Sequence, residues 1–268
     1  MKIYQAIILG IIQGLTEFLP VSSSAHLNLF PWLLGWGEMP ESFDVALHVG
    51  TLLAIVIFFF KDWVNLFVGG YNQVVKKKKT TEGKIFWYLV LSTIPAGVLS
   101  LILDKISKAL FEKSLNVEML VIGITLIVMG IILYVVDKKS KSNIKYEKMT
   151  LKQSMLIGTS QCLAAAFPGV SRSGITMTVA RALGIDREGA ARYSFLLATP
   201  ITAAAVIFDL GKFQFTSLAF CIGILTSFIV GILIIKFLLD YLKKGSFKAF
   251  AIYRVLIGIA VIVAFIIK

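Results

Sequence analysis

Two short polar segments interrupt long hydrophobic stretches and carry the side chains best suited to chemistry. The first, residues 13–26, reads Q-G-L-T-E-F-L-P-V-S-S-S-A-H, and the second, residues 168–174, reads P-G-V-S-R-S-G. Between them they offer an arginine, several hydroxyls, a carboxylate and a histidine. Such groups bind phosphate, hold a hard metal ion and activate a nucleophile. The two segments together therefore indicate phosphate chemistry.

Arg172 is the clearest indication of an anionic ligand, because its planar guanidinium can bind two phosphate oxygens at once. The serines of both segments add hydroxyl donors; they are Ser23, Ser24, Ser171 and Ser173. Two other interpretations stay open. Arg172 could extend to the membrane surface, or it could form a purely structural pair with Glu17.

Glu17 and Gln13 are the predicted metal ligands. An ionised Glu17 beside a bound diphosphate would repel it unless a divalent cation lay between them. Gln13 precedes Glu17 by four residues and therefore lies on the same face of a helix. Carboxylate, amide and phosphate oxygens suit Mg²⁺ or Ca²⁺, so we expect one of these ions as cofactor.

His26 follows Ser23 by three residues, close enough to share a site with it. A Ser–His pair can act as nucleophile and base, or the histidine can protonate a leaving oxygen. The alternative is a histidine that merely satisfies its hydrogen bonds in the core. His48 lacks the company that Glu17 and Ser23 give His26, so we expect it to pack or to hydrogen-bond between helices.

The composition places these residues in a membrane. Of the 268 residues, 57% are hydrophobic and only 16% are charged, and the mean hydropathy is +0.86. A soluble enzyme needs far more charge, so we expect an all-α polytopic membrane protein. The net charge of +12 does not indicate nucleic acid, because the basic residues lie in the connections between hydrophobic stretches. Cys162 and Cys221 lack metal or redox spacing and are expected to pack as small side chains.

The hydrophobic stretches predict two kinds of helix. Half-length helices, too short for a ~30 Å hydrocarbon core, flank each polar segment and form two re-entrant hairpins; they are expected at 3–16, 24–35, 153–166 and 175–184. Six spanning helices are expected at 44–60, 85–103, 117–136, 190–208, 217–239 and 249–267. The expected connections are 61–84, 104–116, 137–152, 181–192, 209–216 and 240–248.

The two polar segments also indicate an internal repeat. Identical Gly, Gln, Leu, Pro and Ser residues recur at an offset of 148 residues, at 10/158, 13/161, 15/163, 20/168 and 23/171. Each half would hold one hairpin and three spanning helices. Because three is odd, the halves would have opposite orientations in the membrane. We therefore expect one membrane domain, 1–268, with an inverted-topology repeat: 1–136, a basic loop 137–149, and 150–268.

The charge distribution agrees with this topology. Four connections expected on the cytoplasmic side hold 18 lysines and arginines, whereas the two on the other side hold 4. The first hairpin and both termini would then face outward, and the second hairpin would enter from the cytoplasm. The polar turns would meet near the midplane, with the positive ends of two helices directed at one anion.

The two motifs resemble the signature stretches of the undecaprenyl-diphosphatase family, also called bacitracin-resistance proteins. The resemblance covers the whole chain and implies a multi-pass phosphatase of the bacterial cell membrane. It would hydrolyse undecaprenyl diphosphate to the monophosphate and phosphate, depend on a divalent cation, recycle the cell-wall lipid carrier and confer bacitracin resistance. The family's first motif begins with Glu or Gln, and this chain has Gln13, so its metal shell would hold a single carboxylate.

The resemblance also implies roles for individual residues. The catalytic set would be Glu17, Ser23, His26 and Arg172, and the phosphate-binding set Ser24, Ser171, Ser173, Gly174 and Thr176. Ser23 would attack the terminal phosphorus and His26 would relay the proton; His26 itself or water are the alternative nucleophiles. The expected partners are the polyprenyl diphosphate and the lipid bilayer, with no nucleic acid, and a homodimer stays open.

One other class of function fits the same features. Inverted repeats with broken helices are typical of secondary transporters, and a phosphate-headed polyprenyl lipid could be the cargo of a transporter or flippase. The combination of Ser, His, Glu and Arg exceeds what binding alone requires and favours the enzyme. A soluble-type acid phosphatase fits poorly, because the chain has no second histidine at a matching place.

Overall fold

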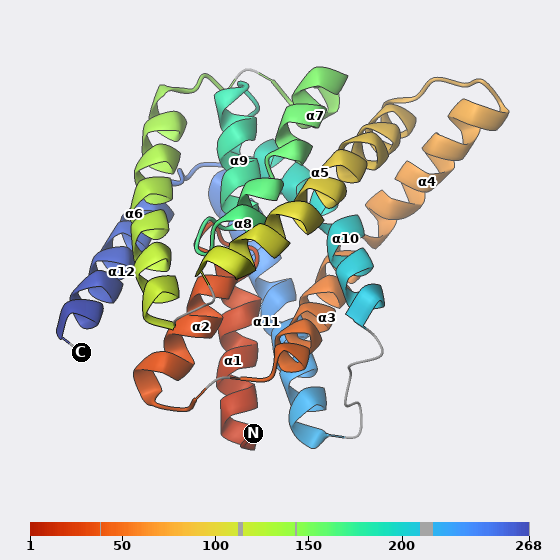
Figure 1. The fold of residues 1–268 in the computed structure, drawn as a ribbon. Coiled ribbons are helices and arrows are strands. Elements are labelled where there is room, and N and C mark those ends of the chain that lie inside the picture. Colours follow the sequence, from red (N-terminus) through yellow and green to blue (C-terminus); the bar gives the residue numbers. More distant parts are fainter. Residues whose placement is uncertain (38, 112–114, 143, 210–216, 268) are drawn as a thin grey trace.

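The computed structural model describes residues 1–37, 39–111, 115–142, 144–209 and 217–267, and the regular elements in these ranges are helices (Figure 1). They are α1 (Ile3–Thr16), α2 (Ser23–Leu34), α3 (Glu41–Phe58), α4 (Phe60–Val75), α5 (Thr81–Phe111), α6 (Leu115–Lys139), the short 3₁₀ turn η1 (Tyr146–Lys148), α7 (Leu151–Thr159), α8 (Cys162–Ala166), α9 (Arg172–Ala182), α10 (Arg187–Asp209), α11 (Leu218–Leu242) and α12 (Lys248–Ile267).

Six of these helices are long and apolar enough to cross a membrane. They are α3, α5, α6, α10, α11 and α12, at the positions expected from the sequence. Large hydrophobic side chains such as Leu101, Ile131 and Leu233 are exposed on them, as lipid-facing side chains are. The prediction of an all-α polytopic membrane protein is therefore confirmed.

The first hairpin consists of α1 and α2. With 14 residues, α1 is about 21 Å long and too short to span a hydrocarbon core. Ser22 caps the start of α2 by accepting a hydrogen bond from the Ala25 amide. Gly35, in the left-handed region, ends α2, whereas Pro31 lies inside the helix without ending it.

The second hairpin is built from three pieces rather than two. The expected half-helix 153–166 is divided into α7 and α8, with the break at Ser160 and Gln161. Ser171 caps the start of α9, and its hydroxyl accepts from the Gly174 amide. In Figure 1 this hairpin enters from the upper end of the bundle and the first one from the lower end, so their turns lie near the middle.

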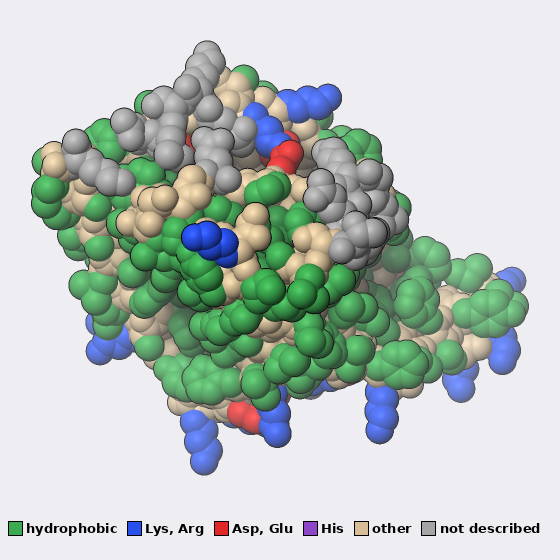
Figure 2. Space-filling model, turned by 90° about the horizontal axis from the view of Figure 1, so that it is seen from below, with side chains coloured by type: hydrophobic (Ala, Val, Ile, Leu, Met, Phe, Trp, Pro, Cys, Tyr) green, Lys and Arg blue, Asp and Glu red, His purple; other side chains and the backbone are tan. Residues whose placement is uncertain are grey.

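The region 61–84 is the clearest departure from the prediction. Its first half is the helix α4 rather than a loop, and only residues 76–80 connect it to α5. The helix forms because its apolar residues recur on one face, among them Val64, Phe67 and Val68. Together α4 and the first part of α5 project from the bundle as an arm, on the right in Figures 1 and 2, and Figure 2 shows hydrophobic side chains with lysines along its outline.

The basic connections lie at one end of the molecule, as expected. The α4–α5 and α6–α7 connections are at the upper end in Figure 1 and the N-terminus is at the lower end. Parts of the two poorly charged connections, residues 112–114 and 210–216, lie outside the described residues. The orientation in the membrane, the internal duplication and the domain boundaries stay predictions.

A buried ion cluster fastens the upper end. Asp137, at the end of α6, accepts from Arg181 of α9 and from Arg187 of α10, each at 2.8 Å, and from the Phe247 amide. Arg181 is fully buried and also donates to the carbonyl of Ile185. Three helices and the residue before α12 therefore meet at one carboxylate, which fixes the upper end of the second hairpin.

Candidate active site

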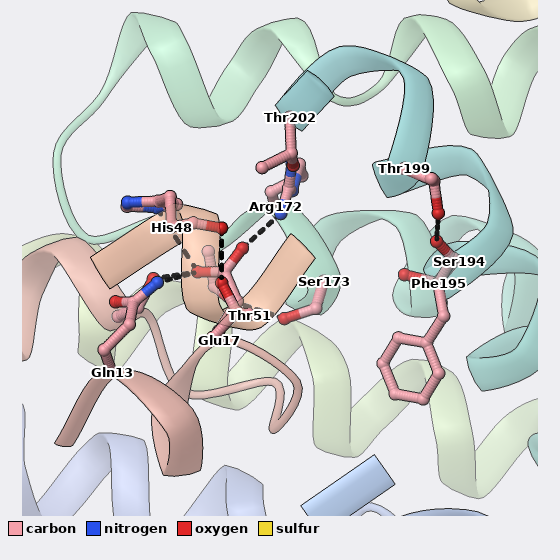
Figure 3. A network of polar contacts seen from close by, with 12 residues as sticks. Gln13, Glu17, His48, Thr51, Arg172, Ser173, Ser194, Phe195, Thr199 and Thr202 are labelled. Atoms are coloured by element: carbon pink, nitrogen blue, oxygen red, sulfur yellow. Dashed lines mark hydrogen bonds and ion pairs between the residues drawn. The ribbon is translucent and has the colours of Figure 1, made fainter. Parts of the chain in front are cut away.

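Glu17 is the centre of a polar cluster where the two hairpin turns meet (Figure 3). Its carboxylate is buried and accepts hydrogen bonds from Gln13 Nε2 at 3.1 Å and from Ser23 Oγ at 2.6 Å. Its other oxygen accepts from Arg172 Nη2, and His48 Nε2 lies 3.6 Å away. One side chain from each of the helices α1, α2, α3 and α9 therefore lies next to this carboxylate.

Arg172 is held from two sides. Besides Glu17, its guanidinium donates to the hydroxyl of Thr202 on α10 at 2.5 Å. Two segments 155 residues apart in the chain thus meet at a single carboxylate, as the sequence predicted. Had Ser23 and Arg172 lain on different surfaces, the hypothesis of a shared site would have been wrong. Arg172 also forms the ion pair with Glu17 that was the alternative to a role in anion binding. This contact is compatible with a structural role and with a role in binding phosphate.

The two turns have the same local geometry. Ser22 and Ser171 both cap a helix and both have a positive φ, 77° and 70°. That conformation costs a non-glycine residue roughly 1–3 kcal/mol, and such strain gathers at functional sites. The match shifts the register of the proposed repeat by one residue: the offset across the turn is 149, so Ser171 corresponds to Ser22 and not to Ser23.

The predicted phosphate-binding residues divide into two groups. Ser173 donates to the Leu19 carbonyl at 3.1 Å and therefore joins the second turn to the first. Thr176 bonds to the Arg172 carbonyl and to Ser194, which supports the start of α9 rather than reaching Glu17. The Gly174 amide donates to the Ser171 hydroxyl in the helix cap, and Ser24 is exposed with its hydroxyl 3.3 Å from that of Ser22.

His26 does not form the expected pair with Ser23. Its Nδ1 donates to the Ser22 carbonyl at 2.7 Å, since a carbonyl can only accept. Its Nε2 therefore accepts from the Tyr253 hydroxyl at 2.8 Å, and the two rings stack. Both ring nitrogens are occupied, and the Ser23 hydroxyl donates to Glu17 instead of to His26.

His48 was expected to pack or to hydrogen-bond between helices, and the structure places it against Glu17, between α3 and the end of α1. Its Nδ1 donates to the Asp44 carbonyl, which leaves Nε2 facing Glu17. Thr51 donates to the carbonyl of His48 one turn along α3. For His48, the available sequence signal was that an ionisable residue inside a membrane helix is rarely there for packing. Thr202, which contacts Arg172, was also missed, and no sequence signal pointed to it.

The donor set fits a hard divalent cation. Among the described residues, Gln13 Oε1 is buried without a hydrogen-bond partner, beside the Glu17 carboxylate. An orphaned amide oxygen next to a carboxylate is a typical pair of ligands for Mg²⁺ or Ca²⁺. No group of three His, Cys, Asp or Glu suited to a metal is found in the described residues, so phosphate and water would have to complete the shell.

A cavity of about 620 Å³ lies beside the first hairpin. It is lined by Leu27, Asn28, Pro31, Trp32, Gly35, Gly37, Met39, Glu41, Asp44 and Glu118. Asp44, in its wall, is the residue whose carbonyl binds His48. The cavity therefore adjoins the Glu17 cluster through α3.

The sequence is similar to that of known proteins along almost its whole length. The family model described as "Bacitracin resistance protein BacA" matches residues 6–260. This chain belongs to that family. A relative from Pelotomaculum thermopropionicum, named undecaprenyl-diphosphatase, is 48% identical over 98% of this chain and 97% of its own length. Relatives of the same name from Caldicellulosiruptor bescii and Moorella thermoacetica are 47% and 41% identical, each over 99% of this chain and 98% of their own length.

Proposed function

We propose that this protein is an undecaprenyl-diphosphatase of the bacterial cell membrane. It hydrolyses undecaprenyl diphosphate to undecaprenyl phosphate and inorganic phosphate, and so recycles the lipid carrier of peptidoglycan synthesis and confers bacitracin resistance. The names of the BacA relatives support this. The observation that carries it is that Ser23 and Arg172, from two different hairpins, both bind the buried Glu17.

The diphosphate would bind where the two turns meet. Arg172 would exchange its contact with Glu17 for phosphate oxygens, to which its fork is matched. The N-terminal ends of α2 and α9 add positive dipole ends at the same place. The polyprenyl tail would lie between helices, in contact with the lipid.

Ser23 would be the nucleophile. Its Oγ attacks the terminal phosphorus, the bond from phosphorus to the bridging oxygen breaks, and undecaprenyl phosphate leaves. The hydroxyl proton passes to Glu17, which already accepts it at 2.6 Å, and from there to Nε2 of His48. Water then attacks the phosphoserine, releases phosphate and restores Ser23. Direct attack by water, or by His26, is the alternative.

Glu17 and Gln13 would hold the divalent cation, by their carboxylate and amide oxygens. When bound, such an ion neutralises the charge that develops on the phosphate oxygens. Arg172 would bind the phosphate oxygens from the side opposite the cation. This division of the charge between a metal and an arginine is typical of phosphoryl-transfer sites.

Phosphate release by the purified protein in detergent tests the proposal, because no membrane separates two compartments there. We expect release from undecaprenyl diphosphate, and its loss in Glu17→Gln and in Arg172→Ala. Ile252→Ala, at an exposed lipid-facing position of α12, serves as the control. Without release by the unchanged protein, the transporter or flippase hypothesis takes precedence. If both variants retained release, the proposed site would be wrong.

The sequence also left open whether the protein forms a homodimer. We propose to determine its oligomeric state from the mass of the protein–detergent complex in the same preparation. A mass of two chains would establish the dimer, and a mass of one chain would exclude it under those conditions.

A further inference from the structure

Arg254, on α12, is buried in the middle of the fold although it carries a charge. It is 1% exposed, and it donates to four carbonyl oxygens: Leu126, Pro20, Gly169 and Val170. Among the described residues no carboxylate forms an ion pair with it. Arg181, the other fully buried arginine, is instead paired with Asp137. A charge at this depth is costly and marks a specific role.

The acceptors show what that role is. Nη1 binds the carbonyl of Pro20, in the first turn, at 3.1 Å. Nη2 binds the carbonyls of Gly169 and Val170, in the second turn, at 2.9 and 3.0 Å. These carbonyls lie between half-helices, where no helical partner is available, and in a membrane they must be satisfied by protein. One guanidinium therefore joins the two turns directly.

Gly174 makes room for this contact. A Cβ at position 174 would lie 2.7 Å from Arg254 Nη1 and 3.1 Å from the Cβ of Ser171. Only glycine leaves space for the guanidinium beside the start of α9. The glycine that the sequence motif placed in the phosphate-binding set thus admits the arginine that holds the turns.

We propose that Arg254 is a positioning residue that fixes the distance between the two turns, so that Ser23 and Arg172 meet at Glu17. It acts through the backbone and does not touch the substrate. The effect on catalysis rests on the proposed phosphatase function, whereas the effect on the turns does not. A lysine would keep the charge but would lose the fork that reaches both turns.

Two measurements on Arg254→Lys test this. Hydrogen exchange needs no activity, and we expect faster exchange of the amides in 17–24 and in 167–174 together. In phosphate release we expect kcat to fall about a hundredfold, because small displacements of reacting groups cost that much, while KM changes severalfold at most. Unchanged exchange in both turns would overturn the positioning role. Faster exchange with no release by the unchanged protein would overturn only the proposed function.

A double-mutant cycle separates positioning from general destabilisation. We expect Gly174→Ala alone to lower kcat strongly, but to add nothing in an Arg254→Met background, because the guanidinium it displaces is already gone. Val261→Ala, a buried residue on the same helix, is the control for lost stability; it should lower the melting temperature with kcat retained. Additive losses in the cycle, or an equal loss of kcat in Val261→Ala, would contradict the proposal.

Discussion

Ser23 and Arg172 occupy corresponding positions in the two turns, each one residue after the serine that caps a helix, and both donate to Glu17. The same local backbone thus presents a hydroxyl in one hairpin and a guanidinium in the other. A pair of similar turns supplies unlike groups: one able to attack phosphorus and one able to bind its oxygens.

Alanine substitutions at Ser23 and at its neighbour Ser24 should differ sharply in their effect on phosphate release. Ser23→Ala removes the hydroxyl that contacts Glu17, so we expect kcat to fall at least about a thousandfold. Ser24 is exposed and contacts Ser22, so Ser24→Ala should change KM by severalfold at most. Both are measured by phosphate release. In rapidly quenched reactions, phosphate on Ser23 would identify the nucleophile, and full turnover in Ser23→Ala would exclude it.

His48→Phe should lower kcat by roughly ten- to a hundredfold, because the proton that reaches Glu17 loses its onward acceptor. KM should be nearly unchanged, since the ring nitrogens of His48 contact the Asp44 carbonyl and Glu17 and form no hydrogen bond with Arg172 among the described residues. Steady-state kinetics with the two parameters separated is the appropriate measurement. A rise in KM at constant kcat would instead assign His48 to binding.

Gln13→Glu should strengthen binding of the divalent cation, because it adds a second carboxylate beside Glu17. We expect the Mg²⁺ or Ca²⁺ concentration for half-maximal activity to fall by roughly tenfold. Chelation by EDTA should abolish phosphate release in both proteins, and restoring the ion should recover it. Undiminished release in EDTA would show that no such cation is needed, and an unchanged half-maximal concentration would remove residue 13 from the metal shell.

Asp137→Ala should destabilise the protein by about 3–5 kcal/mol, because Arg181 would be left buried without its carboxylate. Thermal unfolding in detergent measures this. Asp240→Ala is the matched control, since it removes an aspartate from an exposed pair with Lys243; its melting temperature should stay near that of the unchanged protein. Equal melting temperatures for the two variants would contradict the proposed fastening role.

Much of the site follows from local sequence. A helix places residues four apart on one face, which brings Gln13 to Glu17. Serine before a helical stretch caps it, so α2 starts one residue and α9 three residues before the expected position. The exclusion of charge from long stretches determines the membrane class, because lipid cannot solvate charge. The α4 helix was missed because its apolar face lies among lysines and lacks the length of a membrane span.

Only the tertiary structure decided which distant residues reach the turns. His48, Thr202, Tyr253 and Arg254 come from helices with no local motif, and each contacts a turn because of how those helices pack. Tyr253 occupies the nitrogen that His26 was expected to use, which sequence spacing could not reveal. Neighbouring residues obey the period of the helix, whereas contacts between different helices, 30 or more residues apart here, depend on the packing of whole helices, which no short stretch of sequence encodes.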